Sequence, residues 1–273
     1  MKALESLFSP AKLTKYLRVT GVRSDGMHEL ESEMVALSFG DTIELGDGDG
    51  IEIVDEIGSL ARLEGGLKDV PIDGSNLISK ALTLAGHKAL VRVHKRIPPG
   101  AGLGGGSSNA ATVLRYFKGW GSMERAVSLG ADVPFCIRGG RAIARGVGEV
   151  LQPLPHRPES FVLLLSPFGV STREVYMKFD ALDGDLEEAT NHLDSAAQAC
   201  EPRLAISKDV LRKVSGVEPI LAGSGSTYFV QGTFANLELD SRPILGEGFR
   251  YLDAVIDKTS YRFIEASTLP AFS

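Results

Sequence analysis

Alternating apolar and polar residues mark the strands that the sequence predicts. Residues 42–45 (TIEL) and 51–55 (IEIVD) alternate on either side of GDGDG, a pattern that predicts a hairpin of half-buried strands around a glycine-rich turn. A calcium loop is the competing interpretation of this turn, but it lacks an oxygen ligand two places after Asp49 and a bidentate Glu at the required spacing. Residues 89–95 (ALVRVHK) also alternate and predict a further strand.

Apolar residues at helical spacing mark three helices in the first half of the chain. Residues 76–87 (NLISKALTLAGH) fit a helix with Asn76 as its N-cap. Residues 109–117 (NAATVLRYF) predict a second helix. Residues 122–130 (SMERAVSLG) predict a shorter one, which starts at a serine cap and ends at Gly130.

A proline-rich stretch separates the two halves of the chain. Strand-like segments at 140–145 and 161–165 flank PLPHRPES, which begins at Pro153 and places three prolines within six positions. The sequence therefore predicts a domain over residues 1–155 and a second domain over residues 156–273.

The second half repeats this mixture of patterns without an internal repeat. Residues 171–179 (STREVYMKF) and 206–216 (ISKDVLRKVSG) are helix-like. A glycine cluster, LAGSGSTYFV at 221–230, lies between two apolar stretches.

Composition and charge narrow the class of partner. The 273 residues suffice for two modest domains, and 43% hydrophobic with 23% charged residues is ordinary for a globular protein. The net charge of −6, without a long Lys/Arg run, argues against nucleic acid or an anionic membrane as partner. Cys136 and Cys200 have no disulfide or zinc spacing, and both are expected to be buried thiols.

The chain also lacks the patterns of a secretory signal or a membrane span. Glu5 and Pro10 interrupt the N-terminal stretch where a signal would continue its apolar core, and the apolar run FVLLL at 161–165 is too short to cross a bilayer. A cytoplasmic protein is therefore expected.

The stretch PPGAGLGGGSSNAA at 98–111 carries the strongest chemical pattern. It follows a predicted strand and opens a predicted helix, so backbone N–H groups and the positive end of the helix dipole converge on one point. Such a point attracts an anion, and glycine permits both close approach of a phosphate chain and positive φ angles.

Three other interpretations of this loop compete. A P-loop requires a Lys after the last glycine, which is missing here. A Rossmann loop requires an early position in a βαβ unit and an acidic residue about 20 places on; this loop comes late, and Glu124 opens a helix. A tight turn without a ligand remains as the third.

Together with its neighbours, the loop resembles the phosphate-binding motif of the GHMP small-molecule kinases. SPAKLTKYLRVTGVRSDGMHEL at 9–30 resembles their N-terminal substrate motif, and LAGSGSTYF at 221–229 resembles their C-terminal glycine motif. With LGADVPF at 129–135 and ARGVGE at 144–149, the resemblance narrows to the kinases that act on 4-diphosphocytidyl-2-C-methylerythritol.

The resemblance implies an α+β fold of two domains, one like ribosomal protein S5 domain 2 and one ferredoxin-like, with the active site between them. It implies transfer of the ATP γ-phosphoryl group, with Mg²⁺, to the 2-hydroxyl of a CDP-linked methylerythritol. The residues that match the family's nucleotide loop are Pro98, Pro99, Gly100, Ala101, Gly102, Leu103, Gly104, Gly105, Gly106, Ser107 and Ser108. One of the two serine hydroxyls is expected to cap the helix and the other to reach phosphate or Mg²⁺.

The same motif positions imply a catalytic pair, Lys12 and Asp132. Phosphoryl transfer to an alcohol depends on positioning and charge stabilisation, with a carboxylate taking the proton. We expect Asp132 to act as the base, and Lys12 to keep it ionised and stabilise charge on the attacking oxygen. A surface salt bridge is the alternative interpretation of either residue taken alone.

The acceptor's cytosine needs hydrogen bonds at its edge and a flat surface against its face. His28 matches the position that reads the base, and Tyr176 an aromatic that stacks on it, although without the motif they are typical of a surface histidine and a core aromatic. Two departures stand out: Met27 replaces the usual Tyr, and Thr14 the usual Asn.

A second glycine turn completes the implied substrate site. Gly223, Ser224 and Gly225 are expected to approach the substrate or the γ-phosphate; a turn that only connects strands is the alternative. Competing functions are a GHMP kinase for homoserine or mevalonate, a nucleotide-binding module without catalysis, and a nicotinamide oxidoreductase. The sequence does not indicate an oligomeric state or the metal ligands.

Overall fold

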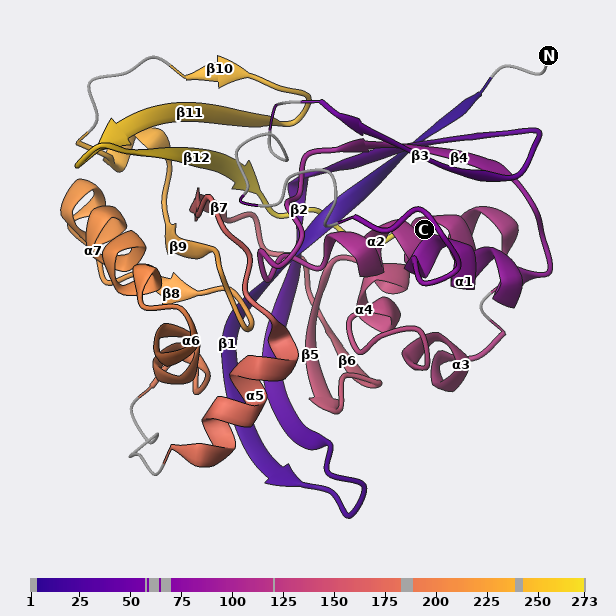
Figure 1. The fold of residues 1–273 in the computed structure, drawn as a ribbon, viewed down its shortest axis with the longest axis horizontal. Helices are drawn as coiled ribbons and strands as arrows, with labels where there is room; N and C mark the ends of the chain where they lie inside the picture. Colours follow the sequence, from indigo (N-terminus) through magenta and orange to yellow (C-terminus); the bar gives the residue numbers. More distant parts are fainter. Residues whose placement is uncertain are drawn as a thin grey trace.

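The computed structural model describes residues 4–56, 58, 64, 70–119, 121–182, 189–238 and 243–272. They form two six-stranded sheets with helices packed beside each (Figure 1). The first half contains β1 (Glu5–Val22), β2 (His28–Gly46), β3 (Gly50–Asp55), α1 (Leu77–Ala85), β4 (Leu90–Lys95), α2 (Gly105–Phe117), α3 (Met123–Val127), α4 (Val133–Arg138), β5 (Arg141–Gly146) and β6 (Val150–Leu154). The second half contains β7 (Ser160–Leu165), α5 (Thr172–Ala181), α6 (Asp194–Cys200), α7 (Arg203–Ser215), β8 (Ile220–Leu221), β9 (Tyr228–Gln231), the 3₁₀ turn η2 (Phe234–Asn236), β10 (Ile244–Leu245), β11 (Phe249–Ile256) and β12 (Thr259–Ser267).

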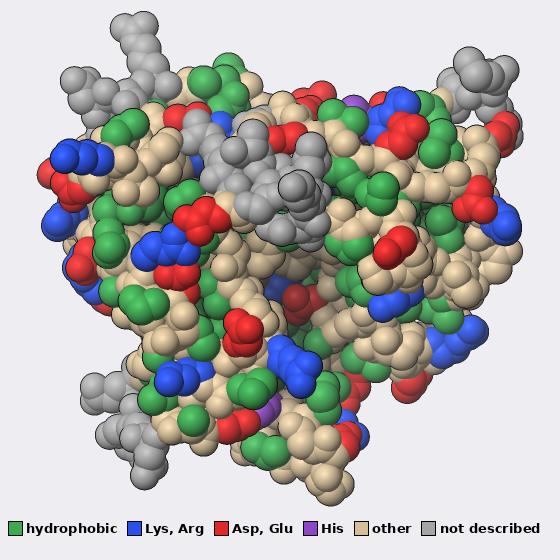
Figure 2. Space-filling model, in the orientation of Figure 1, with side chains coloured by type: hydrophobic (Ala, Val, Ile, Leu, Met, Phe, Trp, Pro, Cys, Tyr) green, Lys and Arg blue, Asp and Glu red, His purple; other side chains and the backbone are tan. Residues whose placement is uncertain are grey.

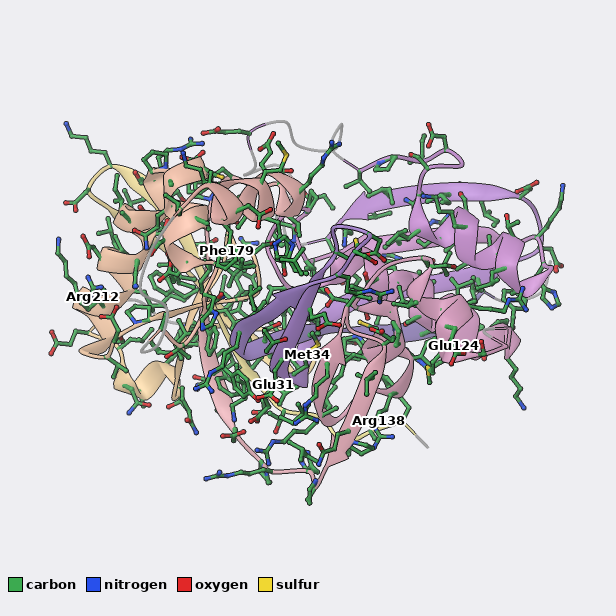
Figure 3. The ribbon with its side chains drawn as sticks, turned by 90° about the horizontal axis from the view of Figure 1, so that it is seen from below. Glu31, Met34, Glu124, Arg138, Phe179 and Arg212 are labelled. Carbon is green, nitrogen blue, oxygen red and sulfur yellow. The ribbon has the colours of Figure 1, made fainter. Side chains whose placement is uncertain are left out.

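The long strand β2 organises the first sheet, whose order is β3-β4-β2-β5-β6. Residues Thr42–Gly46 of β2 pair with β4, and residues Leu30–Val35 pair with β5. Strand β1 pairs antiparallel with β2 along most of its length. The two long strands run between the helices of the first half and those of the second, as the view turned by 90° shows (Figure 3).

The predicted hairpin between β2 and β3 is wrong, although both strands exist. Strand β4 lies between them, pairing antiparallel with β2 and parallel with β3. The GDGDG connection crosses the start of β4: a Cβ on Gly48 would lie 3.2 Å from the Leu90 Cβ. Alternation predicts strands, but it does not predict which neighbour a strand chooses.

The predicted helices of the first half are confirmed. Asn76 caps α1 by accepting a hydrogen bond from the Ile78 N–H at 2.8 Å. Ser122 caps α3 through the Arg125 N–H, and this helix ends at Val127 before the predicted Gly130. Helix α2 begins within the glycines, at Gly105, earlier than predicted.

The second sheet has the order β10-β11-β12-β7-β9-β8, and all its pairs are antiparallel. The predicted strand at 161–165 and the two predicted helices correspond to β7, α5 and α7. The α+β fold class is therefore confirmed. The division at residue 155 stays a prediction, and the chain after β12 returns to the first sheet, where Leu269 N–H donates to the Ala36 carbonyl.

Three hydrophobic clusters stabilise this arrangement. One lies between the first sheet and α1, α2 and α4, and another between the second sheet and α5, α6 and α7. The third joins both halves and includes Leu13, Phe39, Phe161 and Phe229. Because this cluster is continuous across β1, β2, β7 and β9, it fixes the positions of these strands and of the site residues beside them.

The two cysteines differ in burial. Cys136 is buried, but Cys200 is only partly buried, so the expectation of two buried thiols is wrong for Cys200. Within the described ranges, no helix is long and apolar enough to cross a membrane. The cytoplasmic location stays a prediction.

Candidate active site

Two irregularities in β1 bracket the first residues of the site. The register between β1 and β2 shifts between Pro10 and Lys12, and again between Thr14 and Tyr16. Bulges redirect side chains and are frequent beside active sites. Here Lys12 and Thr14 both line a cavity, and both are buried.

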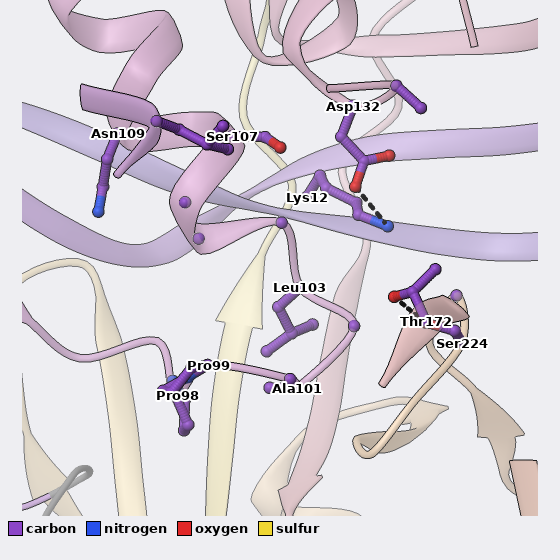
Figure 4. A pocket seen from close by; sticks show the side chains of 18 of the residues that line it. Lys12, Pro98, Pro99, Ala101, Leu103, Ser107, Asn109, Asp132, Thr172 and Ser224 are labelled. Atoms are coloured by element: carbon purple, nitrogen blue, oxygen red, sulfur yellow. Dashed lines mark hydrogen bonds and ion pairs between the residues drawn. The ribbon is translucent and has the colours of Figure 1, made fainter. Parts of the chain in front are cut away.

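Lys12 and Asp132 form an ion pair inside this cavity. The Lys12 Nζ lies 3.2 Å from the Asp132 Oδ2, and it donates a hydrogen bond to the Thr14 hydroxyl at 3.2 Å (Figure 4). The side chains are 7% and 26% exposed, so this pair is not the surface salt bridge that either residue alone suggests. A partly buried pair is screened less by salt than an exposed one.

The position of Asp132 leaves its carboxylate available for this contact. Asp132 precedes α4 as its N-cap residue, yet its side chain makes no capping hydrogen bond. Its carbonyl accepts from the Cys136 N–H at 3.0 Å. An N-cap aspartate normally bonds the helix N–H groups, so the carboxylate here is directed toward Lys12.

The glycine loop has the backbone geometry of an anion site. Gly100, Gly102 and Gly104 have φ angles of 66°, 74° and 66°, in the left-handed region. Gly104 is the N-cap of α2, with no side-chain cap. Left-handed residues next to a helix N-terminus turn successive N–H groups toward one concavity, where a phosphate is stabilised.

Contacts within the protein explain most of these glycines. A Cβ on Gly102 would lie 2.0 Å from the Ala222 carbonyl oxygen, and one on Gly104 would lie 2.7 Å from the Lys12 Cγ. Gly106 differs, because the nearest atom to its Cβ position is 3.6 Å away. Close contacts with other segments of the protein are therefore a further reason for glycine here, besides the predicted phosphate approach and the positive φ angles.

The second glycine cluster lies against the first. The Ser226 N–H donates to the Gly100 carbonyl at 2.9 Å, and the Thr227 N–H donates to the Ala101 carbonyl at 3.2 Å. The cluster also connects β8 to β9, so it is a strand-connecting turn and a wall of the site at once.

The cavity between these loops has a volume of about 520 Å³, within the range of small-molecule sites. The space-filling view is hollowed near its centre, between the two halves of the molecule (Figure 2). Besides the loop residues, the cavity is lined by Leu17, Leu30, Ser32, Met34, Ile53, Val93, Lys95, Asn109 and Tyr176, among others.

The structure brings most of the predicted site residues to this cavity. Every residue from Pro98 to Ser107 lines it, and so do Gly223 and Ser224. Ser108 does not line it, because its buried hydroxyl donates to the Pro10 carbonyl at 2.7 Å. The expectation that a serine hydroxyl caps α2 is wrong, since the cap is a glycine without a side chain. Gly225 also lies outside the lining residues.

His28 and Tyr176 lie together at the β2 end of the cavity. Their ring centroids are 4.8 Å apart with planes inclined by 30°, and the His28 Nε2 lies 2.7 Å from the Asp180 Oδ1. Tyr176 lines the cavity, whereas His28 is not one of the residues that line it. Burial, followed by the charge of Asp132, raises the pKa of Tyr176 far above its usual value, so the phenol stays neutral.

A buried polar network beneath the glycine loop was missed by the sequence interpretation. The Lys95 Nζ lies 2.5 Å from the Asp41 Oδ2, and Asp41 also accepts hydrogen bonds from Asn109 and the Arg96 and Ile97 N–H groups. Lys95 stands at a buried position of the β4 alternation. A lysine at an apolar position just before the loop was the available indication.

The described part of the chain holds no cluster of three or more His, Cys, Asp or Glu side chains suited to a metal ion. Mg²⁺ at phosphoryl-transfer sites usually takes one or two protein oxygens and completes its shell with phosphates and water. Asp132 and the Ser107 hydroxyl, both lining the cavity, fit that requirement.

The chain is similar to known kinases both in sequence and in structure. Residues 76–140 match the family model of the GHMP kinases N terminal domain. A 4-diphosphocytidyl-2-C-methyl-D-erythritol kinase of Paracoccus denitrificans is 36% identical over 247 residues, covering 84% of this chain and 86% of that protein. One of Granulibacter bethesdensis is 33% identical, with 93% and 97% covered. A crystal structure of a 4-(cytidine 5'-diphospho)-2C-methyl-D-erythritol kinase superposes with a TM-score of 0.63 at 30% identity, covering 84% of this chain and 90% of that one.

Proposed function

The chain belongs to the 4-diphosphocytidyl-2-C-methyl-D-erythritol kinases, a family of GHMP kinases, and from this membership we propose how its cavity works. The enzyme transfers the γ-phosphoryl group of ATP to the 2-hydroxyl of 4-diphosphocytidyl-2-C-methyl-D-erythritol, in the non-mevalonate route to isoprenoid precursors. The single observation that carries the assignment of residues is the Lys12–Asp132 pair facing the glycine loop within one cavity.

The triphosphate of ATP binds at the glycine loop. The left-handed glycines and the N-terminus of α2 supply N–H donors and a positive dipole end. The apolar end of the cavity, with Ile53, Val93 and Pro98 among its lining residues, is then left for the nucleoside. Ser107 and Asp132, which both line the cavity, would hold Mg²⁺, and the ion would supply positive charge to neutralise the phosphates.

Asp132 acts as the base for the attacking hydroxyl. Its carboxylate makes no capping bond and is paired with Lys12, which leaves it positioned to accept the proton of the hydroxyl. The Lys12 ammonium stabilises charge that develops on the attacking oxygen. Thr14 holds this ammonium in place by accepting its hydrogen bond.

The cytidine of the acceptor binds at the β2 end of the cavity. Tyr176 offers a flat face from the cavity wall, and His28, whose Nε2 is held by Asp180, offers its Nδ1 to the base edge. Met27 stands where the motif that the sequence resembles has a tyrosine, and it is 51% exposed, so its thioether can pack against the base without donating a hydrogen bond.

The test is ADP formation by the purified protein with ATP, Mg²⁺ and the CDP-linked methylerythritol. We expect turnover to require all three. Replacing the acceptor with homoserine or mevalonate should abolish it, because neither offers a base to Tyr176 and His28. Turnover with one of those two acceptors, and none with the CDP-linked one, would identify a different GHMP kinase.

A further inference from the structure

A buried side-chain amide holds the second glycine cluster in place. The Asn191 Nδ2 donates to the Leu221 carbonyl at 2.8 Å and to the Gly223 carbonyl at 2.7 Å, while its Oδ1 accepts from the Leu193 N–H at 2.9 Å. Asn191 is 5% exposed and bridges to Leu17 of β1. Every hydrogen-bonding atom of this amide is thus used inside the protein.

The backbone N–H groups of the cluster divide into two sets. Four of them donate to carbonyls: those of Ala222, Gly225, Ser226 and Thr227. Those of Gly223 and Ser224 have no hydrogen-bond partner among the residues that the structure describes. Gly223 and Ser224 are also the cluster residues that line the cavity, so the unpaired donors coincide with its wall.

The hydrogen bond from Asn191 to the Gly223 carbonyl fixes the direction of the Ser224 N–H. In a trans peptide the C=O and the following N–H point in opposite directions. The Gly223 carbonyl points to Asn191, so the Ser224 N–H points away from it. The left-handed φ of 59° at Gly223 is the conformation from which backbone anion nests are built.

Gly223, the residue directly before this donor, lies beside the proposed catalytic residues. The Cβ position of Gly223 is 3.2 Å from the Lys12 Nζ and 3.4 Å from the Gly102 carbonyl oxygen. An anion held here therefore sits between the Lys12 ammonium and the first glycine loop. That place can be occupied by the diphosphate of the acceptor or by the γ-phosphate of ATP.

We infer that Asn191 is a positioning residue for phosphate recognition: by holding the Gly223 carbonyl, it turns the Ser224 N–H into the cavity, where this group donates to a phosphate oxygen. The inference rests on the proposed function and deepens it. Asn191 touches no substrate atom, because its own amide is fully engaged with Leu221, Gly223 and Leu193.

Asn191→Ala and Asn191→Asp test this inference in the full chain. Alanine releases the carbonyl, and aspartate places acceptor oxygens against two carbonyl oxygens. Dissociation constants are measured by calorimetry for CDP and cytidine, and for a non-hydrolysable ATP analogue and ADP. Loss of one charge-assisted hydrogen bond weakens binding roughly 10-fold or more.

If the acceptor diphosphate is held, CDP weakens roughly 10-fold relative to cytidine. If the γ-phosphate is held, the ATP analogue weakens relative to ADP by a similar factor. A ratio of two affinities is insensitive to the folded fraction of a sample, so a mild loss of stability does not imitate either result. Both ratios unchanged would overturn the inference.

Asn236→Asp is the matched control, because the Asn236 amide also accepts a backbone N–H but lies in the turn η2, away from the cavity. Both ratios should stay at the wild-type value. Should the Asn191 variants not fold, the wild-type protein decides: the Ser224 amide proton should shift downfield in NMR spectra on titration with CDP or with the ATP analogue. No shift with either contradicts the inference, whereas a wild-type protein that binds neither nucleotide contradicts the proposed function instead.

Discussion

At the scale of single residues, the proposed role of Asp132 as the base can be tested separately from substrate binding. Its carboxylate contacts Lys12 and makes no helix-capping bond. Asp132→Asn keeps the shape and removes the proposed base, so we expect kcat to fall roughly 10²- to 10⁴-fold, while the affinity for CDP changes little. Steady-state kinetics and calorimetry measure the two quantities. A variant with near-normal turnover would show that Asp132 is not the base.

The two cysteines allow a second residue-scale prediction. Burial, and then the nearby charge of Asp132, raises the pKa of the Cys136 thiol to about 12, so at neutral pH it is protonated and unreactive. Cys200 is partly exposed. Ellman's reagent should therefore label one thiol in the native protein and two in denaturant. Native Cys200→Ser should not react, and rapid labelling of that variant would contradict the burial of Cys136.

At the scale of elements, alanine variants of the glycine loop show which of its positions require glycine. In Gly102→Ala, a Cβ would meet the Ala222 carbonyl oxygen at 2.0 Å from a left-handed backbone. We expect a loss of roughly 2–4 kcal/mol in the free energy of unfolding, because two chain segments must move apart. Denaturant unfolding measures this loss.

Gly106→Ala is the matched variant within the same loop. Its Cβ has room, and alanine is favoured over glycine inside a helix, so stability should rise by up to about 1 kcal/mol. If a phosphate rests on this backbone, KM for ATP should rise at the same time. A rise in stability with an unchanged KM would place the phosphates elsewhere along the loop.

Sequence patterns predicted individual helices and strands better than they predicted strand pairing. Periodicity and caps predicted α1, α3 and the strand β4, because a local hydrogen bond such as that of Asn76 is encoded within three residues. The hairpin of β2 and β3 was wrong, because β4 comes from 35 or more residues later and inserts between them. Strand pairing depends on packing between segments that are distant in sequence. The alternation of residues within one segment carries no information about its partner.

At the scale of the whole molecule, the site exists because segments distant in sequence converge. Lys12, the glycine loop, Asp132 and the 221–226 cluster come from both halves of the chain, and a shared hydrophobic cluster holds them together. Motifs predicted these positions, since they have recognisable residue patterns. Asp41 and Asn191 have none: each is an ordinary polar residue whose role depends on the carbonyls and N–H groups that the fold places around it.

A charged cluster on β1 and β2 also links the two sheets. The Lys15 Nζ lies 3.1 Å from a Glu33 oxygen and 2.9 Å from a Glu159 oxygen, just before β7, while Arg141 of β5 donates to Glu33. Burial by itself would raise the pKa of Glu33, but the hydrogen bonds from Arg141 and Lys15 outweigh it, and the pKa is lowered from 4.5.

The lowered pKa of Glu33 predicts how stability depends on pH. A carboxyl whose pKa is lower in the folded state contributes stability above its unfolded pKa, and this contribution is lost as pH falls through the folded pKa. Glu33→Gln should therefore be less stable than the wild type at neutral pH, and the two unfolding free energies should converge as pH falls below about 4.5. Glu52→Gln removes a carboxylate from an exposed pair with Arg92 and should follow the wild-type curve at every pH. If Glu33→Gln instead ran parallel to the wild type down to acid pH, its carboxylate would not be held ionised by Lys15 and Arg141, and the link between the sheets would rest on the hydrophobic cluster alone.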